Sequence, residues 1–132
     1  MSIDRLSNML SSIKNAVMAG NSFIETVHSK ECESVAKVLK SAGFLSEVKS
    51  FKTKGKKHKG LRLELAKEGD DFKISDVKRI SKPGRRLYMK ARDIRPVSGG
   101  FGILVLSTSR GIMEGMQAKQ KKLGGEILCE VS

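Results

Sequence analysis

The sequence predicts an α+β protein, with helices near its beginning and short strands through the rest. Apolar residues recur at helical spacing over residues 6–17 and 35–42. After residue 44 the apolar runs become short or alternating and are bounded by Gly and Pro, which is typical of strands. We expect two small α/β domains packed together: helices on a small sheet in residues 1–68, and a mostly β domain with one short helix in residues 69–132.

Both predicted helices carry start and stop signals. Ser2 or Asp4 can cap the first helix, and Gly20 stands where it would end. Ser29 is a good cap for the second helix, which Gly43 stops. Lys30, at the start of that second helix, is an ordinary solvated residue in one interpretation. In the other, the backbone amides beside it receive a phosphate.

Two strands are expected next, at 44–52 and 61–65. In the second, leucines alternate with polar residues, so one face is buried and the other is solvated. The connection, 52–60, is a glycine-bounded hairpin tip with five lysines and a histidine. Most charge runs are solvated loops. In a chain this basic, a contact of Lys56 and Lys57 with a phosphate backbone is an equally good interpretation.

An acidic turn, 68–71, marks the best domain boundary. Its two adjacent aspartates have no further carboxylate or histidine at ligand spacing, so we expect no metal site and no cofactor. Beyond it, strands at 74–81 and 86–91 flank Lys82-Pro83-Gly84-Arg85, where Pro then Gly at the centre predicts a type II hairpin turn.

Basic residues surround Tyr88 on the second of these strands, among them Lys82, Arg85 and Arg86. Cations interleaved with an aromatic ring on a β surface suit RNA, because cations meet phosphates and a ring can stack on a base. The alternative is that Tyr88 packs in the fold and its hydroxyl finds a partner there.

A short apolar run, Ile103–Leu106, has the length and composition of a strand covered on both faces. It stops at three hydroxyl residues, followed by a cation: Ser107, Thr108, Ser109 and Arg110. Small groups that both donate and accept hydrogen bonds suit close contact with a base edge, a ribose or a phosphate. The alternative is that they only turn the chain and cap the next helix.

The remaining elements are a short helix at 114–122, weakened by Gly115, and a last strand at 126–131. Gly124-Gly125 allows a tight turn between them. Cys32 and Cys129 belong to no paired motif and are expected to be buried free thiols, although a disulfide between them remains open.

The formal net charge is +12 and the sequence pI is about 10.0. Residues 1–48 contain five basic and five acidic side chains, so the whole excess lies after Val48. Such a surface attracts polyanions, above all nucleic acid. An anionic membrane is the weaker alternative, since no long basic amphipathic helix is present. With no apolar run of membrane-spanning length and no signal peptide, we expect a cytoplasmic protein.

The order and spacing of several segments resemble the bacterial-type small-ribosomal-subunit protein eight family. The N-terminal half is similar more loosely, through Ile13–Ala16 and Ser29–Lys30. The specific matches lie in the second half, and they are Ile80–Tyr88, Gly100–Ile103, Leu106–Met113 and Gly124–Cys129.

The resemblance implies a structural protein of the ribosome that binds the central domain of small-subunit rRNA and helps its assembly. It also implies neighbouring small-subunit ribosomal proteins as partners and, in some bacteria, repression through an rRNA-like site on the operon mRNA. The residues implied in RNA contact are Ser107, Thr108, Ser109, Tyr88, Gly124, Gly125 and Glu126.

A ribonuclease is the competing class. Metal-free cleavage of RNA requires two histidines, or a histidine and a lysine, at one phosphate. His28 stands before a helix and His58 stands on the charged tip, so their convergence would be accidental. We therefore expect no catalytic residues.

Overall fold

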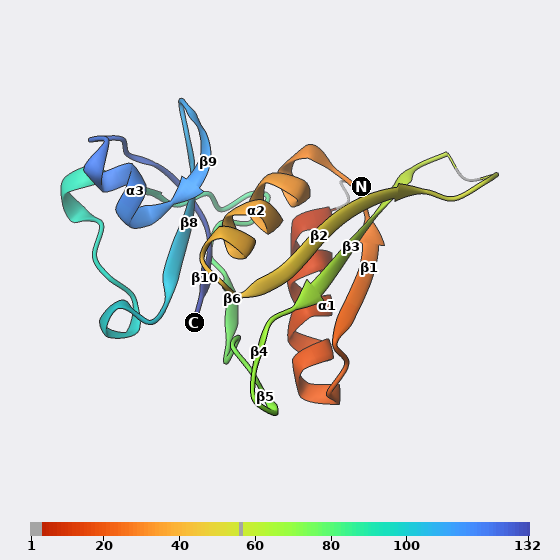
Figure 1. The fold of residues 1–132 in the computed structure, drawn as a ribbon. Helices are drawn as coiled ribbons and strands as arrows, with labels where there is room; N and C mark the ends of the chain where they lie inside the picture. The colour runs from red at the N-terminus through yellow and green to blue at the C-terminus, as the bar shows by residue number, and fades with distance from the viewer. Residues whose placement is uncertain (1–3, 56) are drawn as a thin grey trace. The chain divides into compact units, whose positions relative to one another are not determined.

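The computed structural model describes residues 4–55 and 57–132, which form two compact units divided after Ser75 (Figure 1). The first unit contains two helices and an antiparallel sheet in the order β1-β3-β2. A small hairpin of β4 and β5 follows and includes the acidic turn. The bounds are α1 Arg5–Ala19, β1 Phe23–Val27, α2 Lys30–Ser41, β2 Leu45–Lys52, β3 Lys59–Leu65, β4 Lys67–Glu68 and β5 Asp71–Phe72.

Both helices begin and end as the sequence predicts. The Asp4 carboxylate accepts a hydrogen bond from the Ser7 amide, and the Ser29 hydroxyl accepts one from the Cys32 amide at 3.1 Å. Gly20 ends α1 with φ of 77°, a left-handed conformation that glycine adopts without strain. Cys32 lies in the core, and it and Cys129 are buried free thiols, as expected.

The core of the first unit lies between the helices and one face of the sheet. The alternating leucines of β3, at 61, 63 and 65, all point to that buried face. The edge strand β1 was not predicted, because only Ile24 of its five residues is buried and the apolar pattern is therefore weak. No helix in the described part of the chain is long and apolar enough to cross a membrane.

The second unit is built on a five-stranded antiparallel sheet in which β10 is central. β6, β7 and β8 all pair with β10, and β9 pairs with β8. Val105 and Leu106 are adjacent in β8 and both fully buried, which confirms a strand covered on both faces. The bounds are β6 Val77–Arg79, β7 Tyr88–Met89, β8 Ile103–Thr108, β9 Gly111–Glu114, α3 Gly115–Gln120 and β10 Gly125–Val131.

The predicted pairing of 74–81 with 86–91 is wrong, although the turn between them is right. Lys82 and Arg85 exchange two backbone hydrogen bonds, and Gly84 has the positive φ that a type II turn requires. Beyond that turn the two strands separate, because each pairs with a different part of β10. Strand pairing is decided by long-range contacts that the local turn signal does not contain.

The alternative in which the hydroxyl residues only turn the chain and cap the next helix is right about the turn and wrong about the cap. A two-residue turn, Ser109-Arg110, leads into β9 instead, which pairs with β8. The helix α3 follows β9, within the range that the sequence predicts, and is capped by the Glu114 carboxylate, which accepts a hydrogen bond from the Gln117 amide. The hydroxyl residues therefore do not cap a helix.

Candidate nucleic-acid interface

Three strands bring three of the sequence-predicted residues of the second unit together. In the pairing of β10 with its neighbours, Glu126 lies opposite Tyr88 of β7 on one side and opposite Ser107 of β8 on the other. Residues directly opposite one another share a face of the sheet. The side chains of Tyr88, Glu126 and Ser107 thus form one row across the sheet, which we call the Tyr88 row.

The paired glycines allow β10 to approach its neighbours closely. A Cβ atom added to Gly124 would lie 2.7 Å from the carbonyl oxygen of Met89. One added to Gly125 would collide with the carbonyl group of Ser107, with 2.9 Å to its carbon. These neighbours are backbone atoms that cannot move aside independently. Gly124 and Gly125 therefore contribute to the site by permitting the strand spacing that builds the Tyr88 row.

Tyr88 is exposed and leaves its ring available to a ligand. It is 70% exposed, so the alternative in which this residue packs in the fold is wrong. Beside it, Glu126 keeps only 15% of its side chain exposed and forms an ion pair with Arg86, whose Nη1 lies 3.5 Å from Oε1. The row combines an aromatic face with a carboxylate held in place by a cation.

The three hydroxyl residues do not act alike. Thr108 braces the turn, because its hydroxyl donates to the Gly111 carbonyl at 2.8 Å and accepts from the Arg110 amide at 3.1 Å. Ser107 is half-buried in β8, on the Tyr88 row. Ser109 stands in the turn itself and is exposed, so it does not end the buried strand. Only Ser107 combines a fixed strand position with membership of the row.

Four of the exposed cations of this unit are the ones that the sequence singled out. Lys82 and Arg85 bound the Pro-Gly turn, Arg86 pairs with Glu126, and Arg110 stands at the tip of the β8–β9 hairpin. Exposed guanidinium and ammonium groups are suited to phosphate contacts. We group these four cations with the Tyr88 row and call the set the β10 face.

The comparisons with known proteins place the chain in a family. The sequence profile of the family described as Ribosomal protein S8 matches residues 4–132. The chain belongs to that family. It is 42% identical to "Small ribosomal subunit protein uS8" of Rhodopirellula baltica, with both chains covered in full. It is 38% identical to "Small ribosomal subunit protein uS8c" of Spirogyra maxima, again over both chains in full. A uS8 protein of Chlamydia trachomatis serovar L2b is 41% identical, covering 99% of this chain and 98% of that one.

One residue of the Tyr88 row in this member of the S8 family was missed by sequence reasoning. Ile112 of β9 lies opposite Ser107 and extends the row by a half-buried apolar side chain. It was missed because β9 itself was not predicted. The available signal was the two-residue Ser109-Arg110 turn, with Gly111 after it at φ of 110°.

The remaining residues that are predicted to contact RNA belong to the first unit or lie outside the residues that the structure describes. Lys30 is the first residue of α2 and is exposed, and Lys57 is exposed in the connection between β2 and β3. Lys56 lies outside the described residues. Among the residues that the structure describes, no group of His, Cys, Asp and Glu is placed to hold a metal ion.

Proposed function

We propose that this member of the S8 family is a structural constituent of the small ribosomal subunit. In this proposal it binds the central domain of the small-subunit rRNA through the β10 face and helps that domain assemble. The Tyr88 row is the observation that supports this proposal. In it, the pairing of three strands places Tyr88, Glu126 and Ser107, which are distant in the sequence, side by side. A further part of the proposal is that neighbouring small-subunit proteins are its other partners.

The chemistry of the row suits a distorted RNA helix. Regular A-form RNA hides its base edges in a deep, narrow groove, so recognition depends on bases that are splayed out of the stack. The Tyr88 ring offers a stacking surface, the Glu126 carboxylate accepts hydrogen bonds from base amino or imino groups, and Ser107 both donates and accepts. Arg85 and Lys82 supply phosphate contacts that position the helix.

An mRNA that folds into the same shape would meet the same groups. The proposed repression of the operon therefore requires no second site, and it predicts that rRNA and mRNA compete for the β10 face. We assign no reaction to this surface, and the RNA is expected to remain intact after long incubation with the protein.

The test compares serine variants on two RNAs at one fixed salt concentration. Ser107→Ala is expected to weaken binding to the central-domain rRNA fragment by about 1–3 kcal/mol, because it leaves an RNA polar group without its partner. Ser109→Ala is expected to weaken the same binding by less, because Ser109 is exposed in the turn and lies outside the Tyr88 row. Binding to a plain RNA duplex should change little, since a regular duplex does not present the same base edges.

Ser50→Ala is the matched control, because Ser50 is exposed on β2 in the first unit. Thermal melting of every variant checks that it is folded. If both Ser107→Ala and Ser109→Ala bind the cognate fragment as the parent does, the hydroxyl residues do not select the RNA. The RNA interface would then be sought by footprinting the protein with and without the rRNA fragment, to find which other residues become protected.

A further inference from the structure

A groove of about 500 Å³ lies at one end of the sheet in the first unit. Its floor comes from one row of that sheet, because Gly60 of β3 lies opposite both Val27 of β1 and Phe51 of β2. The connection between β2 and β3 provides the rest of the lining through Thr53, Lys57 and His58. The groove therefore joins an apolar sheet surface to the basic hairpin tip.

Gly60 determines where the Phe51 ring lies. A Cβ atom at Gly60 would collide with the ring, with 2.6 Å to Cε2, so the ring occupies the space that any other residue would fill. Phe51 is half-buried, and Val27 beside it is 44% exposed. The result is an aromatic ring laid against the sheet surface with an open groove next to it.

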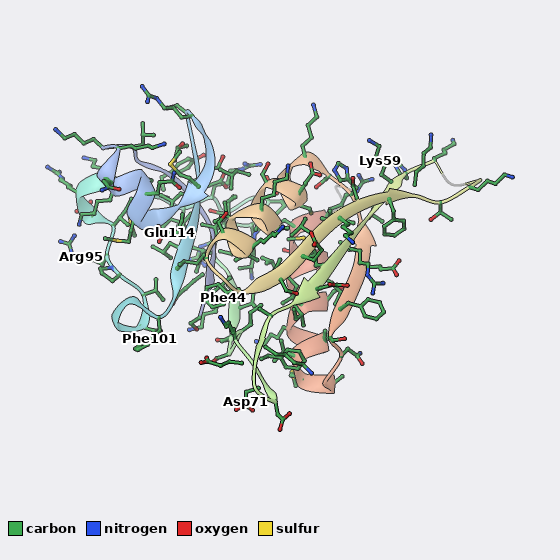
Figure 2. The ribbon with its side chains drawn as sticks, viewed as in Figure 1. Phe44, Lys59, Asp71, Arg95, Phe101 and Glu114 are labelled. Atoms are coloured by element: carbon green, nitrogen blue, oxygen red, sulfur yellow. The ribbon has the colours of Figure 1, made fainter. Side chains whose placement is uncertain are left out.

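The charge around the groove is mainly positive. Lys57 and Lys59 line it, and Lys52 and Lys54 lie in the same hairpin and are exposed. Figure 2 labels Lys59 where the hairpin narrows toward its tip. The one carboxylate in the lining, that of Glu25, is engaged by Arg62 of β3, whose Nη1 lies 3.3 Å from Oε1.

We propose that this groove binds unpaired RNA, with one base stacked at Phe51 and the flanking phosphates beside Lys57 and Lys59. An aromatic platform beside a cationic track is how proteins hold single strands, because every base has a π face and every nucleotide has a phosphate. The charge complementarity favours an anionic strand over a neutral apolar partner. The inference rests on the proposed function as an RNA-binding protein and adds a second site in the other unit.

Phe23 provides an internal comparison on the same sheet. It is 42% exposed in β1, but the Arg62 guanidinium lies 3.8 Å from the centre of its ring. A base cannot stack on that face without displacing the cation. Phe51 and Phe23 therefore lie on the same sheet, but only the Phe51 ring lines an open groove, whereas a face of the Phe23 ring is covered by Arg62.

Fluorescence can separate stacking from simple attraction, because the chain contains no tryptophan. Phe51→Trp and Phe23→Trp each introduce a single reporter. A short single-stranded oligoadenylate is expected to quench the emission of Phe51→Trp and to leave that of Phe23→Trp unchanged. A plain RNA duplex should quench neither.

Affinity measurements provide the second readout. Phe51→Leu is expected to weaken oligoadenylate binding about tenfold, within the range of one lost stacking contact, and Phe23→Leu should leave it unchanged. Gly60→Ala keeps the aromatic ring but displaces it, and should weaken the same binding. Melting curves confirm that each variant is folded.

The inference and the proposed function fail in different ways. If the parent binds the central-domain rRNA fragment but Phe51→Trp shows no quenching and Phe51→Leu no loss, the groove is not a nucleotide site. An acidic protein segment would then be the occupant to test. If the parent binds neither the rRNA fragment nor the oligoadenylate, the proposed RNA-binding function fails, and the inference fails with it.

Discussion

At the scale of single residues, Thr108 shows how a polar side chain can serve the fold beside a proposed binding surface. Its hydroxyl donates to the Gly111 carbonyl and accepts from the Arg110 amide, and it thereby closes the turn between β8 and β9. That turn holds Ser109 and Arg110 in place. We infer that Thr108 acts on RNA only through the turn that it braces.

The first prediction replaces Thr108 with valine, which keeps the branched shape and removes the hydroxyl. We expect the free energy of unfolding to fall by about 1 kcal/mol, because two hydrogen bonds at a partly exposed site are lost. Chemical denaturation measures it. Ser109→Ala is the control and should change stability by less than about 0.5 kcal/mol, since the residue is exposed. Equal losses in the two variants would contradict the assignment.

Cys32 is a second residue whose surroundings make a measurable prediction. Burial raises the pKa of its thiol, although the hydrogen bond to Ser29 acts in the opposite direction. The folded protein therefore binds the thiol proton more tightly than the unfolded chain. The stability from this difference is fully present below the unfolded pKa, about 8.5, and is lost as pH rises through the folded value.

We accordingly expect the free energy of unfolding of the parent to decline above about pH 8.5 more steeply than that of Cys32→Ala. Denaturant titrations at a series of pH values measure the difference between the two proteins. The comparison cancels the titration of the many lysines that both proteins share. Parallel pH profiles would show that Cys32 ionises in the folded protein as easily as in the unfolded chain.

At the scale of elements, one buried hydroxyl fixes the segment that leads from β6 to β7. Ser81 is fully buried, and its hydroxyl donates to the Leu87 carbonyl and accepts from the Leu87 amide. The Leu87 carbonyl also accepts from the Ile127 amide of β10. Residues 82–86, with their cations, therefore form a loop closed at its base and attached to the central strand.

Ser81→Ala should open that loop, because it removes the buried hydroxyl to which the Leu87 amide donates. The expected loss in the free energy of unfolding is about 1–3 kcal/mol. Hydrogen exchange provides the specific readout, and the Leu87 amide should exchange faster while the amides of β8 stay protected. Ser50→Ala is again the exposed control. An unchanged exchange rate at Leu87 would show that backbone pairing alone closes the loop.

At the scale of the whole molecule, the net charge of +12 predicts a strong dependence of RNA binding on salt. If roughly four to six phosphates are neutralised, a plot of log affinity against log salt should have a slope of about −3 to −5. A slope near zero over a salt titration would contradict the proposed RNA binding.

Single cations test where those phosphates lie. Arg85→Ala should make the slope shallower by about one unit, because it removes one of the phosphate contacts that we propose for the β10 face. Lys37→Ala removes the same charge from the exposed face of α2 and serves as the control. Equal effects of the two variants would mean that only the total charge matters.

The sequence alone determined the class of fold and the first two helices with their caps. It also indicated the hydroxyl residues and the paired glycines as candidate site residues. These features depend on local physics: periodicity of apolar residues, a side-chain cap, and the positive φ of Gly20 and Gly84. The strong resemblance of the second half to the S8 family is also a property of the sequence alone.

Only the tertiary structure decided which strands pair and therefore what the site contains. It separated the strands around the Pro-Gly turn, added β9 with Ile112, and showed that Thr108 braces a turn while Ser107 joins Tyr88 and Glu126. Pairing in a sheet depends on hydrogen bonds between segments far apart in the chain, so no local pattern contains it. The groove beside Phe51 has the same origin, since Val27, Gly60 and Phe51 come from three different strands.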